Sequence, residues 1–392
     1  MSQYHVYQNP LIGSTVGVVF GSFAPLHQGH LDLIMRAKKE NDAGCIVIVC
    51  GYDGDKGEPL MPHKKRYRYV REYFANDNLV AVYSINDTEI GANAYPDGWA
   101  KWMEAFEEIY NKATATNIPN HPTCKWYVGD TNYYYDLAGM NEEVVLVDRL
   151  AENPICATMI RQNPVKHWNK IAFPFKRVFS HNILICGTAS EGKTTLVEDL
   201  GKYFNAPYSH EYARTYMAES GVSEHELDCA DYMAFLDGQY NLNKKLINSP
   251  ANQGIFFADT DSMVTRMYAE HYANDETLDF TVEDFQKVAV MADELTYKSR
   301  WDKIFLIAPK GVFVDDHVRL MKHAAMEERM KLYDILVANL KRCNLWNKVT
   351  VLDGGAYYQN FLTIKKYVED YMMNGWGNEQ CIRPQNFSKN TL

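Results

Sequence analysis

Short runs of β-branched residues alternate with longer helical patterns along most of the chain. In its first part, five apolar runs predict strands, at 16–20, 45–50, 79–85, 126–128 and 144–147. Helical patterns separate most of these runs, at about 29–41, 64–76 and 99–112. Parallel strands need crossover connections, and helices usually supply them. The alternation therefore predicts the α/β class, with doubly wound parallel sheets.

The alternation pauses once and then restarts. Residues 167–180 are aromatic and basic and contain Pro174. After this stretch, strands are predicted at 182–186, 255–258, 304–307 and 349–352, and a last helix at 358–373. A length of 392 residues also favours two or three domains. We therefore predict domains at 1–172 and 181–373, a linker at 173–180, and a polar tail at 374–392.

Composition excludes several classes of protein. Acidic residues outnumber basic ones by 50 to 40, and there is no basic block, which argues against a nucleic-acid partner. No apolar run approaches the roughly 18 residues of a membrane helix, and the start has no signal-peptide pattern. Eight scattered cysteines without a C-x-x-C pair indicate reduced thiols. We expect a cytoplasmic protein without membrane or nucleic-acid partners. The sequence does not decide whether it forms a homo-oligomer.

The first candidate site is the segment 21–30, which follows the first strand and opens the first helix. A helix N-terminus offers free N–H groups and a positive dipole end to a phosphate. His27 and His30 are three residues apart, so both can face that phosphate. Two surface histidines on a capped turn would explain H-x-G-H equally well, but the preceding G-x-F-x-P favours a nucleotide site. The candidate nucleotide-binding residues here are Gly21, Ser22, Phe23 and Gly29.

This segment resembles the G-x-F-x-P-x-H-x-G-H signature of the nucleotidyltransferase superfamily. Its members transfer a nucleoside monophosphate from a triphosphate to a phosphate-bearing acceptor. A second signature of the superfamily, S-x-T-x-x-R, resembles residues 156–161, in which Thr158 and Arg161 match and Cys156 replaces the serine. The guanidinium of Arg161 could bind polyphosphate, whereas a thiol is a weak hydrogen-bond donor.

The resemblance implies a reaction that needs little general-base catalysis. The acceptor phosphate is already an anionic nucleophile, so the protein has only to align it and neutralise charge. His27, His30, Arg161 and Mg²⁺ would suffice for that. ATP would be the substrate that donates the nucleotide.

Two other segments could complete the first site. Gly129 and Asp130 end the fourth predicted strand and could hold the adenosine ribose, although Asp130 could equally cap the next helix. Trp99 could stack on an aromatic acceptor. Trp102 lies one helical turn further on, and we expect core packing for at least one of these two rings.

The second candidate site is a phosphate-binding loop at 187–194, which fits G-x-x-x-x-G-K-[ST]. It lies between a predicted strand at 183–186 and a helix at 195–204, and this context argues against a glycine-rich turn that binds nothing. Backbone N–H groups would surround the phosphates, Lys193 would reach the β- and γ-phosphates, and Thr194 would bind Mg²⁺. The candidate ATP-binding residues are Gly187, Ser190, Glu191, Gly192, Lys193, Thr194 and Thr195.

Acidic residues downstream could complete this site. The predicted strand at 255–258 runs into Asp259, the expected magnesium-side carboxylate, and Asp261 follows as a substrate ligand or a helix cap. Glu211 and Arg214 occupy the place that faces the phosphate acceptor in small P-loop kinases. A solvated ion pair on a helix would look the same.

A lid is expected between the third and fourth predicted strands of the second domain. Residues 314–319 follow the strand that ends near Pro309, and Arg329 follows further on. In small-molecule kinases this region folds arginines over the transferring phosphoryl group. We therefore assign Arg319 a catalytic role. Arg329 could instead lie on a charged helix surface.

Taken together, the two sites resemble the NadR family. The resemblance covers about 15–373 and includes the domain order, Glu-Tyr-Ala-Arg at 211–214 and Asp-Thr-Asp at 259–261. It implies that the second domain phosphorylates nicotinamide riboside to nicotinamide mononucleotide (NMN) with ATP. The first domain would then adenylylate NMN to NAD, releasing pyrophosphate. Some NadR proteins are repressors with an N-terminal helix-turn-helix, but only about 14 residues precede the first strand here.

Two alternatives stay open at this point. A coenzyme A synthase, which joins phosphopantetheine adenylyltransferase to dephospho-coenzyme A kinase, has the same domain order. It typically has T-x-G-H where this chain has His27-Gln28-Gly29-His30. A catalytically weak NAD sensor would belong to a different class. Cys156 favours the sensor slightly, whereas intact Lys193 argues against it.

Overall fold

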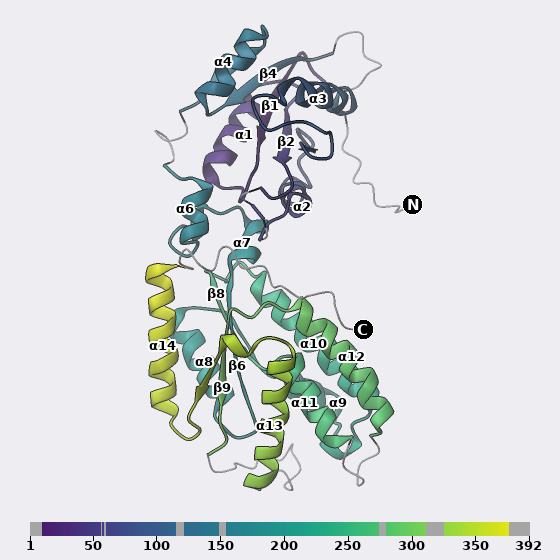
Figure 1. The fold of residues 1–392 in the computed structure, drawn as a ribbon, viewed down its shortest axis with the longest axis vertical. Helices are drawn as coiled ribbons and strands as arrows, with labels where there is room; N and C mark the ends of the chain where they lie inside the picture. The colour runs from purple at the N-terminus through teal and green to yellow at the C-terminus, as the bar shows by residue number, and fades with distance from the viewer. Residues whose placement is uncertain are drawn as a thin grey trace. The chain divides into compact units, whose positions relative to one another are not determined.

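The computed structural model describes residues 10–55, 57–58, 60–114, 121–148, 154–273, 280–310 and 325–375. It divides into two compact units, one formed by 1–178 with 374–392 and the other by 179–373. Each unit consists of a parallel β-sheet with helices between its strands (Figure 1). The fold class predicted from the sequence is therefore confirmed.

The first unit is built on a five-stranded sheet of order β3-β2-β1-β4-β5. All neighbouring strands are parallel. The strands are β1 (Thr15–Gly21), β2 (Cys45–Gly51), β3 (Val80–Asn86), β4 (Thr123–Val128) and β5 (Glu143–Leu146). Because the chain proceeds outward from β1 in one direction and then returns to β4 on its other side, the order reverses between β1 and β4. Ligands of doubly wound sheets bind outside the carboxyl ends of the strands at such a point.

Helices connect these strands and cover the sheet. They are α1 (Gln28–Glu40), α2 (His63–Tyr73), α3 (Trp99–Ala113), α4 (Thr131–Gly139), α6 (Ala157–Gln162) and α7 (Phe173–Phe179). Helix α1 packs on β1 and β4, α2 on β2 and β3, and α3 on β3. Alternating strand residues such as Val18, Ile46 and Ile48 are fully buried with Trp126 between the layers. This core fixes the strand ends from which the first site is built.

The segment 173–180, for which the sequence predicts a linker, is largely helical. Its helix α7 begins at Phe173, and Phe175 is fully buried with its ring 5.4 Å from that of Tyr69 on α2. Arg177 also forms an ion pair with Glu72 of α2. The aromatic and basic composition of this stretch therefore reflects packing on the first unit.

The second unit has a parallel sheet of order β10-β9-β6-β8-β7. Its strands are β6 (His181–Gly187), β7 (Tyr208–Ser209), β8 (Ile255–Asp259), β9 (Lys303–Ile307) and β10 (Val349–Leu352). Ile185 of β6 is in register with Asp259 of β8. The loop after β6 and the acidic end of β8 therefore emerge side by side at one edge of the sheet.

The helices of the second unit are α8 (Lys193–Phe204), α9 (Tyr212–Ser220), α10 (Cys229–Ile247), α11 (Ser262–Tyr272), α12 (Val282–Lys298), α13 (Met326–Arg342) and α14 (Tyr357–Asn374). Four of them, α10, α12, α13 and α14, are longer than any described helix of the first unit. Helices α9, α10, α11 and α12 pack on one another around a core of their own, which includes Phe235, Leu236 and Val288. The predicted tail beyond 375 lies outside the described residues.

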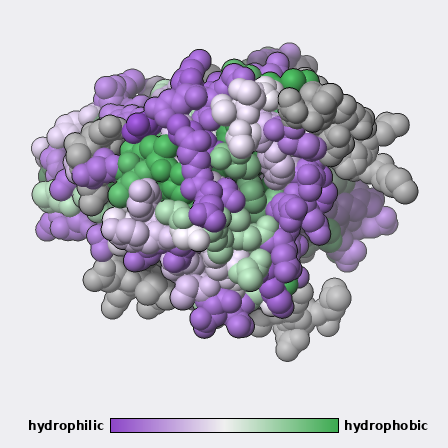
Figure 2. Space-filling view, turned by 90° about the horizontal axis from the view of Figure 1, so that it is seen from above, coloured by the Kyte–Doolittle hydropathy of each residue, from purple (hydrophilic) through white to green (hydrophobic). Residues whose placement is uncertain are grey.

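Polar and apolar side chains are mixed over the face shown in Figure 2, where hydrophilic residues predominate and hydrophobic areas are smaller. In the ranges that the structure describes, none of the helices combines the length and the apolar composition needed to cross a bilayer.

Candidate active sites

The first site is centred on the loop that follows β1, at the reversal of the strand order. Its two histidines lie close together: the ring centroids of His27 and His30 are 3.8 Å apart and the rings are tilted by only 28°. His27 stands at the N-cap of α1 with extended backbone and is only 3% exposed. The alternative interpretation of two surface histidines is therefore wrong for His27. Both imidazoles are held at the start of the helix, where its N–H groups are directed outward.

Tight packing orients these rings. Phe23, at a positive φ of 44°, places its buried ring edge-on against His30, with centroids 5.0 Å apart. A Cβ on Gly29 would lie 3.4 Å from the ring of His27, which is an ordinary van der Waals contact. The predicted roles of Phe23 and Gly29 in nucleotide binding stay predictions, but the ring of Phe23 does orient His30.

The second signature meets the first through Arg161. Its guanidinium donates one hydrogen bond to the carbonyl oxygen of Ala24 and another, 3.1 Å long, to the hydroxyl of Thr158. Residues 137 positions apart in the sequence are thus brought together, as the resemblance implies. Cys156 is the N-cap of α6, and its exposed side chain makes no capping hydrogen bond. A serine hydroxyl at this N-cap could accept a hydrogen bond from the first turn of α6, which the thiol of Cys156 does not do.

The sequence analysis did not identify Arg66, whose side chain holds the loop after β1 in place. Arg66 is fully buried and forms an ion pair with Asp55. The same guanidinium donates to the carbonyl oxygens of Ser22 and Cys50, at the ends of β1 and β2. It therefore joins the two strand ends at the site. The only available signal was spacing, because Arg66 lies on the same face of α2 as the buried His63 and Val70.

Asp130 and Trp99 occupy positions that the sequence left open. Asp130 caps α4, accepting a hydrogen bond of 2.9 Å from the backbone N–H of Asn132. This is the helix-cap alternative, and the adenosine contact predicted for Gly129 and Asp130 stays a prediction. Gly129 directly follows β4, which is parallel to β1 and beside it. It therefore lies at the same edge of the sheet as the histidine loop.

Trp99 and Trp102 are stacked, with centroids 5.3 Å apart and rings tilted by 3°. Trp102 is buried in the core, as expected for at least one of the two. Trp99 is only partly buried, and its ring also stacks on Tyr133 at 6.1 Å. The acceptor contact predicted for Trp99 stays a prediction.

The second site is built on the loop between β6 and α8. Positive φ angles at Gly187, Ser190 and Gly192 (149°, 61° and 73°) wind the backbone into a loop that can present successive N–H groups. A Cβ on Gly187 would lie 2.7 Å from the carbonyl oxygen of Ile307, which makes glycine obligatory there. Lys193 is 7% exposed, and its ammonium donates to the carbonyl oxygen of Thr188 at 2.8 Å. The loop thus has the conformation and the cation of a phosphate-binding site, while Thr195 is exposed on the first turn of α8.

Asp259 and Thr194 meet at the centre of this site. Asp259 is fully buried at the end of β8, and the hydroxyl of Thr194 donates to one of its carboxylate oxygens. Burial raises the pKa of Asp259, while the nearby ammonium of Lys193 opposes that shift. Among the described residues, the other carboxylate oxygen has no hydrogen-bond partner although it is buried. A hydroxyl beside an unsatisfied buried carboxylate oxygen is a donor set that suits Mg²⁺.

Asp261 has a different environment from Asp259. It caps α11, accepting from the backbone N–H of Met263 at 3.1 Å, and its other oxygen accepts from the indole of Trp301 at 2.9 Å. Burial raises its pKa to about 6. The structure shows the helix-cap alternative, and the substrate contact predicted for Asp261 stays a prediction.

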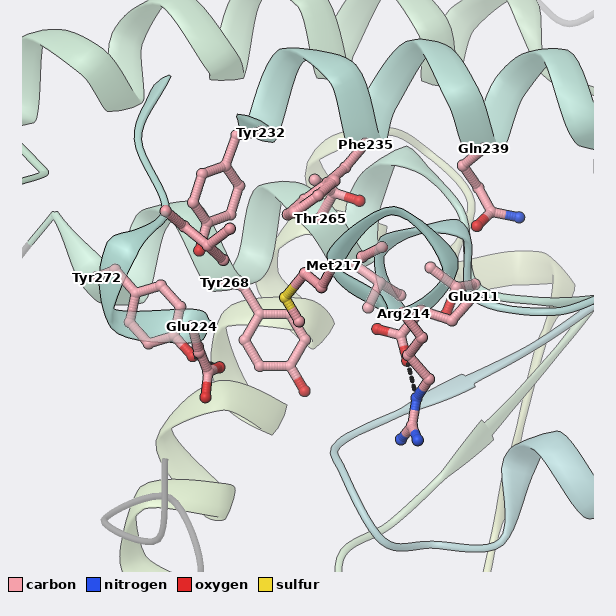
Figure 3. Close-up of a pocket in the computed structure, with 14 residues that line it drawn as sticks. Glu211, Arg214, Met217, Glu224, Tyr232, Phe235, Gln239, Thr265, Tyr268 and Tyr272 are labelled. Carbon is pink, nitrogen blue, oxygen red and sulfur yellow. Dashed lines mark hydrogen bonds and ion pairs between the residues drawn. The ribbon is translucent and has the colours of Figure 1, made fainter. Parts of the chain in front are cut away.

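A pocket opens beside Asp259 between α9, α10 and α11 (Figure 3). The space between its lining atoms is about 590 Å³, part of it open to solvent. Glu211 and Arg214 line it and form an ion pair of 3.0 Å. Glu211 is only 8% exposed, so the alternative of a solvated surface pair is wrong for it. The rest of the lining is mainly aromatic and apolar.

The lid prediction falls largely outside the described residues, which include neither 314–319 nor Arg319. Arg329, on α13, is described and is 1% exposed, so the interpretation as charged helix surface is wrong. Its guanidinium forms an ion pair with Glu191 of the phosphate loop and contacts the carbonyl oxygen of Ala189 at 3.4 Å. The side chain of Glu191 is therefore bound by α13, and any ATP contact of this residue would come from its backbone.

Comparisons with known proteins match both halves of the chain. Residues 18–163 match the cytidylyltransferase-like family, and residues 182–357 match a family described as an AAA domain. The trifunctional NAD biosynthesis/regulator protein NadR of Salmonella typhimurium LT2 is 29% identical over 345 residues, covering 84% of this chain and 77% of that protein. The protein of the same name from Escherichia coli K12 is 28% identical over 374 residues, covering 91% and 83%.

Two solved structures are similar over nearly the whole chain. A NadR protein in complex with NR is 34% identical, with a TM-score of 0.80 and coverage of 92% of this chain and 97% of that one. A NadR protein in complex with NAD and AMP-PNP is also 34% identical, with a TM-score of 0.78 and coverage of 92% and 98%. Both units of this chain are thus matched within a single relative.

Proposed function

The chain belongs to the NadR family, and we infer from this and from its two phosphate-binding sites that it is a bifunctional enzyme of NAD synthesis. The second unit phosphorylates nicotinamide riboside to NMN with ATP. The first unit adenylylates NMN with a second ATP, giving NAD and pyrophosphate. The solved relatives bind NR, NAD and an ATP analogue, which supports these ligands for this chain. The relatives reported above favour the NadR activities over those of a coenzyme A synthase.

One observation carries this proposal. The chain has two separate nucleotide-type sites, each at a strand–helix junction and each with its own cations. The stacked pair of His27 and His30 meets Arg161 through the signature loop in the first unit. Lys193 and the contact between Thr194 and Asp259 form the second. A kinase site and an adenylyl-transfer site in one chain allow the product of one reaction to be the substrate of the other.

For adenylyl transfer, we propose that the first unit acts by alignment and charge neutralisation. A phosphate oxygen of NMN forms a bond to the α-phosphorus of ATP while the bond from that phosphorus to the leaving pyrophosphate breaks. No proton has to be removed, because the attacking oxygen is already anionic. His27 and His30 donate hydrogen bonds to the charge that grows in the transition state, and Arg161 binds the polyphosphate. The buried position of His27 supports this, because donors fixed before the reaction need no reorganisation.

For the kinase reaction, we propose that Glu211 orients the 5′-hydroxyl of the riboside and accepts its proton. The hydroxyl oxygen forms a bond to the γ-phosphorus of ATP, and the bond to the departing ADP breaks. Lys193 neutralises the β- and γ-phosphates, and Arg214 keeps the carboxylate of Glu211 in place through their ion pair. The support is that Glu211 is buried, lines the pocket and lies close enough to Asp259 to influence its pKa.

We propose Mg²⁺ as the cofactor of the kinase site, held by Thr194 and Asp259. The buried Asp259 oxygen that has no partner among the described residues fits such an ion. Within those residues there is no cluster of three or more His, Cys, Asp or Glu side chains, so the phosphates and water would supply the remaining ligands. When bound, the ion would neutralise phosphate charge as it develops.

A single incubation tests both activities. Purified protein is mixed with ATP, Mg²⁺ and nicotinamide riboside, and the products are separated by chromatography. We expect NMN and then NAD, and NAD with pyrophosphate when NMN is supplied instead. Absence of NMN from the first incubation would contradict the kinase, and absence of NAD from the second would contradict the adenylyltransferase.

A further inference from the structure

Thr260 lies directly after β8 and has a backbone conformation that its residue type disfavours. Its φ angle is 106°, in a region that residues with a Cβ rarely adopt. Of the described non-glycine residues with a positive φ, it is the only one that is branched at Cβ. Strain of this kind lowers stability, and proteins keep it mainly at sites that bind ligands. The strain therefore marks Thr260 as a candidate functional residue.

Two fixed neighbours hold Thr260 in this conformation. Asp259 is fully buried at the end of β8, where the strand pairs with Ile185 of β6. Asp261 caps α11 and accepts a hydrogen bond of 2.9 Å from the indole of Trp301. Only one residue separates the last position of the strand from the cap of the helix. The change of direction therefore falls on Thr260, and the surrounding structure keeps it there.

The side chain of Thr260 is a buried polar group that the fold does not use. It is 3% exposed and lines the pocket beside Asp259. Among the described residues, its hydroxyl has no hydrogen-bond partner. Gln239, another polar residue of the lining, accepts from the backbone N–H of Tyr212 at 2.7 Å and donates to the carbonyl oxygen of His210 at 3.2 Å. Gln239 thus supports the fold, whereas the hydroxyl of Thr260 is left for a ligand in the pocket.

This hydroxyl is close to the groups that we propose for phosphoryl transfer. Glu211 and Arg214 line the same pocket, and their charges shift the pKa of Asp259 in opposite directions. The three charged groups are therefore near one another, and Thr260 directly follows Asp259. A hydroxyl can both donate and accept a hydrogen bond, which suits a ligand alcohol that does the same. The phosphates of ATP, by contrast, have the loop after β6 as their expected site.

We propose that the hydroxyl of Thr260 binds a ribose hydroxyl of the phosphate acceptor and so aligns the acceptor with the γ-phosphorus of ATP. This rests on the proposed function, in which the acceptor is a riboside. Thr260 takes no part in proton transfer, which stays with Glu211. The riboside supplies the hydrogen-bond partner that the fold does not supply. Binding of the acceptor therefore removes a cost that the free protein carries.

Thr260→Val tests this contact, because valine keeps the size and the Cβ branching of threonine and removes only the hydroxyl. The midpoint of thermal unfolding of the ligand-free protein should rise by about 2–6 °C, since an unbonded buried hydroxyl becomes a methyl group. The kcat/KM for nicotinamide riboside should fall by about three- to tenfold, as for the loss of one neutral hydrogen bond. The KM for ATP should not change. Thr260→Ser keeps the hydroxyl and should retain the kcat/KM of the wild type.

Thr296→Val is the matched control, because Thr296 is a buried threonine of the same unit that lies outside the pocket. It is 7% exposed, and its hydroxyl donates to the carbonyl oxygen of Ala292 at 2.8 Å and lies 2.8 Å from the hydroxyl of Ser262. This variant loses hydrogen bonds within the protein. Its unfolding midpoint should therefore fall, while its kcat/KM for the riboside stays at the wild-type value. The two valine variants should thus change stability in opposite directions.

Calorimetric titration of the full chain with nicotinamide riboside, without ATP, separates acceptor binding from transfer. Weaker binding by Thr260→Val than by wild type and Thr260→Ser is the expected result. If the wild type phosphorylates the riboside but Thr260→Val keeps its affinity and kcat/KM, or is less stable than the wild type, the role of Thr260 is refuted and the proposed function stands. If the wild type binds the riboside through Thr260 without phosphorylating it, the kinase proposal fails and the contact stands. If the wild type does not bind the riboside at all, both proposals fail.

Discussion

Breaking the buried pair between Arg329 and Glu191 should destabilise the second unit. Their side chains are 2% and 0% exposed, so Arg329→Met would leave the Glu191 carboxylate buried without its guanidinium. Removing one partner of such a pair costs about 3–5 kcal/mol. For a unit of this size, each kcal/mol lowers the midpoint of thermal unfolding by about 2–4 °C, so we expect a shift of about 6–20 °C. Glu191 lies between two loop residues with positive φ, so the KM for ATP of the kinase should also rise.

The same helix supplies a matched control. Arg342 of α13 makes two hydrogen bonds to Asp293, but both side chains are exposed to about 40%, at 44% and 39%. Arg342→Met should therefore cost no more than about 1 kcal/mol. The double variant Arg329→Met with Glu191→Gln removes both buried charges and should recover much of the lost stability.

Calorimetry of the full chain measures the shift, and thermal inactivation of the kinase is followed beside that of adenylyl transfer. Only the kinase should become more labile, since Arg329 and Glu191 both belong to the second unit. The reasoning would be refuted if Arg329→Met lowered the unfolding temperature no more than Arg342→Met.

Four further predictions concern the two sites. Lys193→Ala should abolish riboside phosphorylation and spare NMN adenylylation; equal loss of both in a folded variant would show that the sites are not independent. His30→Ala should lower kcat for adenylylation by about 10²-fold or more, as for a lost transition-state donor, and an unchanged kcat would remove His30 from the mechanism. Cys156→Ser places a hydroxyl at the N-cap of α6, so the KM for ATP in the NMN reaction should stay level or fall. One neutral hydrogen bond should improve the free energy of ATP binding by about 1 kcal/mol at most. A tenfold rise in this KM would refute a phosphate contact here. Burial raises the pKa of Asp261 to about 6, so its contribution to stability is full below pH 4 and is lost as the pH rises through 6. Asp261→Asn should therefore flatten the plot of unfolding free energy against pH over this range, as measured by denaturant unfolding. An unchanged plot would contradict the raised pKa.

Features encoded in short segments could be predicted from the sequence. The strands follow from apolar runs, and the observed ends differ from the predicted ones by only a few residues, as in β1 and β8. The phosphate loop and the histidine signature are predictable because glycine, lysine and histidine at fixed spacings have few other uses. The contact between Thr194 and Asp259 follows from the register of β6 and β8, which parallel pairing makes predictable once both strands are located.

Features that depend on distant partners could not be predicted. Arg66 looks like an ordinary surface arginine in the sequence, and Arg329 was considered only for a lid or a charged helix surface, because arginine is rarely buried unless it is paired. Their partners, Asp55 and Glu191, are 11 and 138 residues away and belong to no motif that marks them as such. Most of the pocket lining could not be predicted for the same reason, since the pocket is assembled by helices that share no recognisable signature. For Asp130 and Asp261, a ligand contact and a helix cap need the same residue type at the same position. They differ only in the direction of the side chain, which the sequence does not show.

The connection between β6 and β8 has a consequence for how this enzyme can change over evolutionary time. The phosphate loop and the buried carboxylate of Asp259 are fixed relative to each other by two adjacent strands, whereas the chain between them contains α8, β7, α9 and α10. The pocket beside Asp259, in which we propose that the acceptor binds, takes much of its lining from that connection, including Glu211, Glu224 and Tyr232. Substitutions, insertions or deletions in α9 and α10 can therefore alter which alcohol is accepted while the ATP machinery keeps its geometry. Such an arrangement lets a lineage exchange one acceptor for another without first losing the ability to hydrolyse or transfer a phosphoryl group.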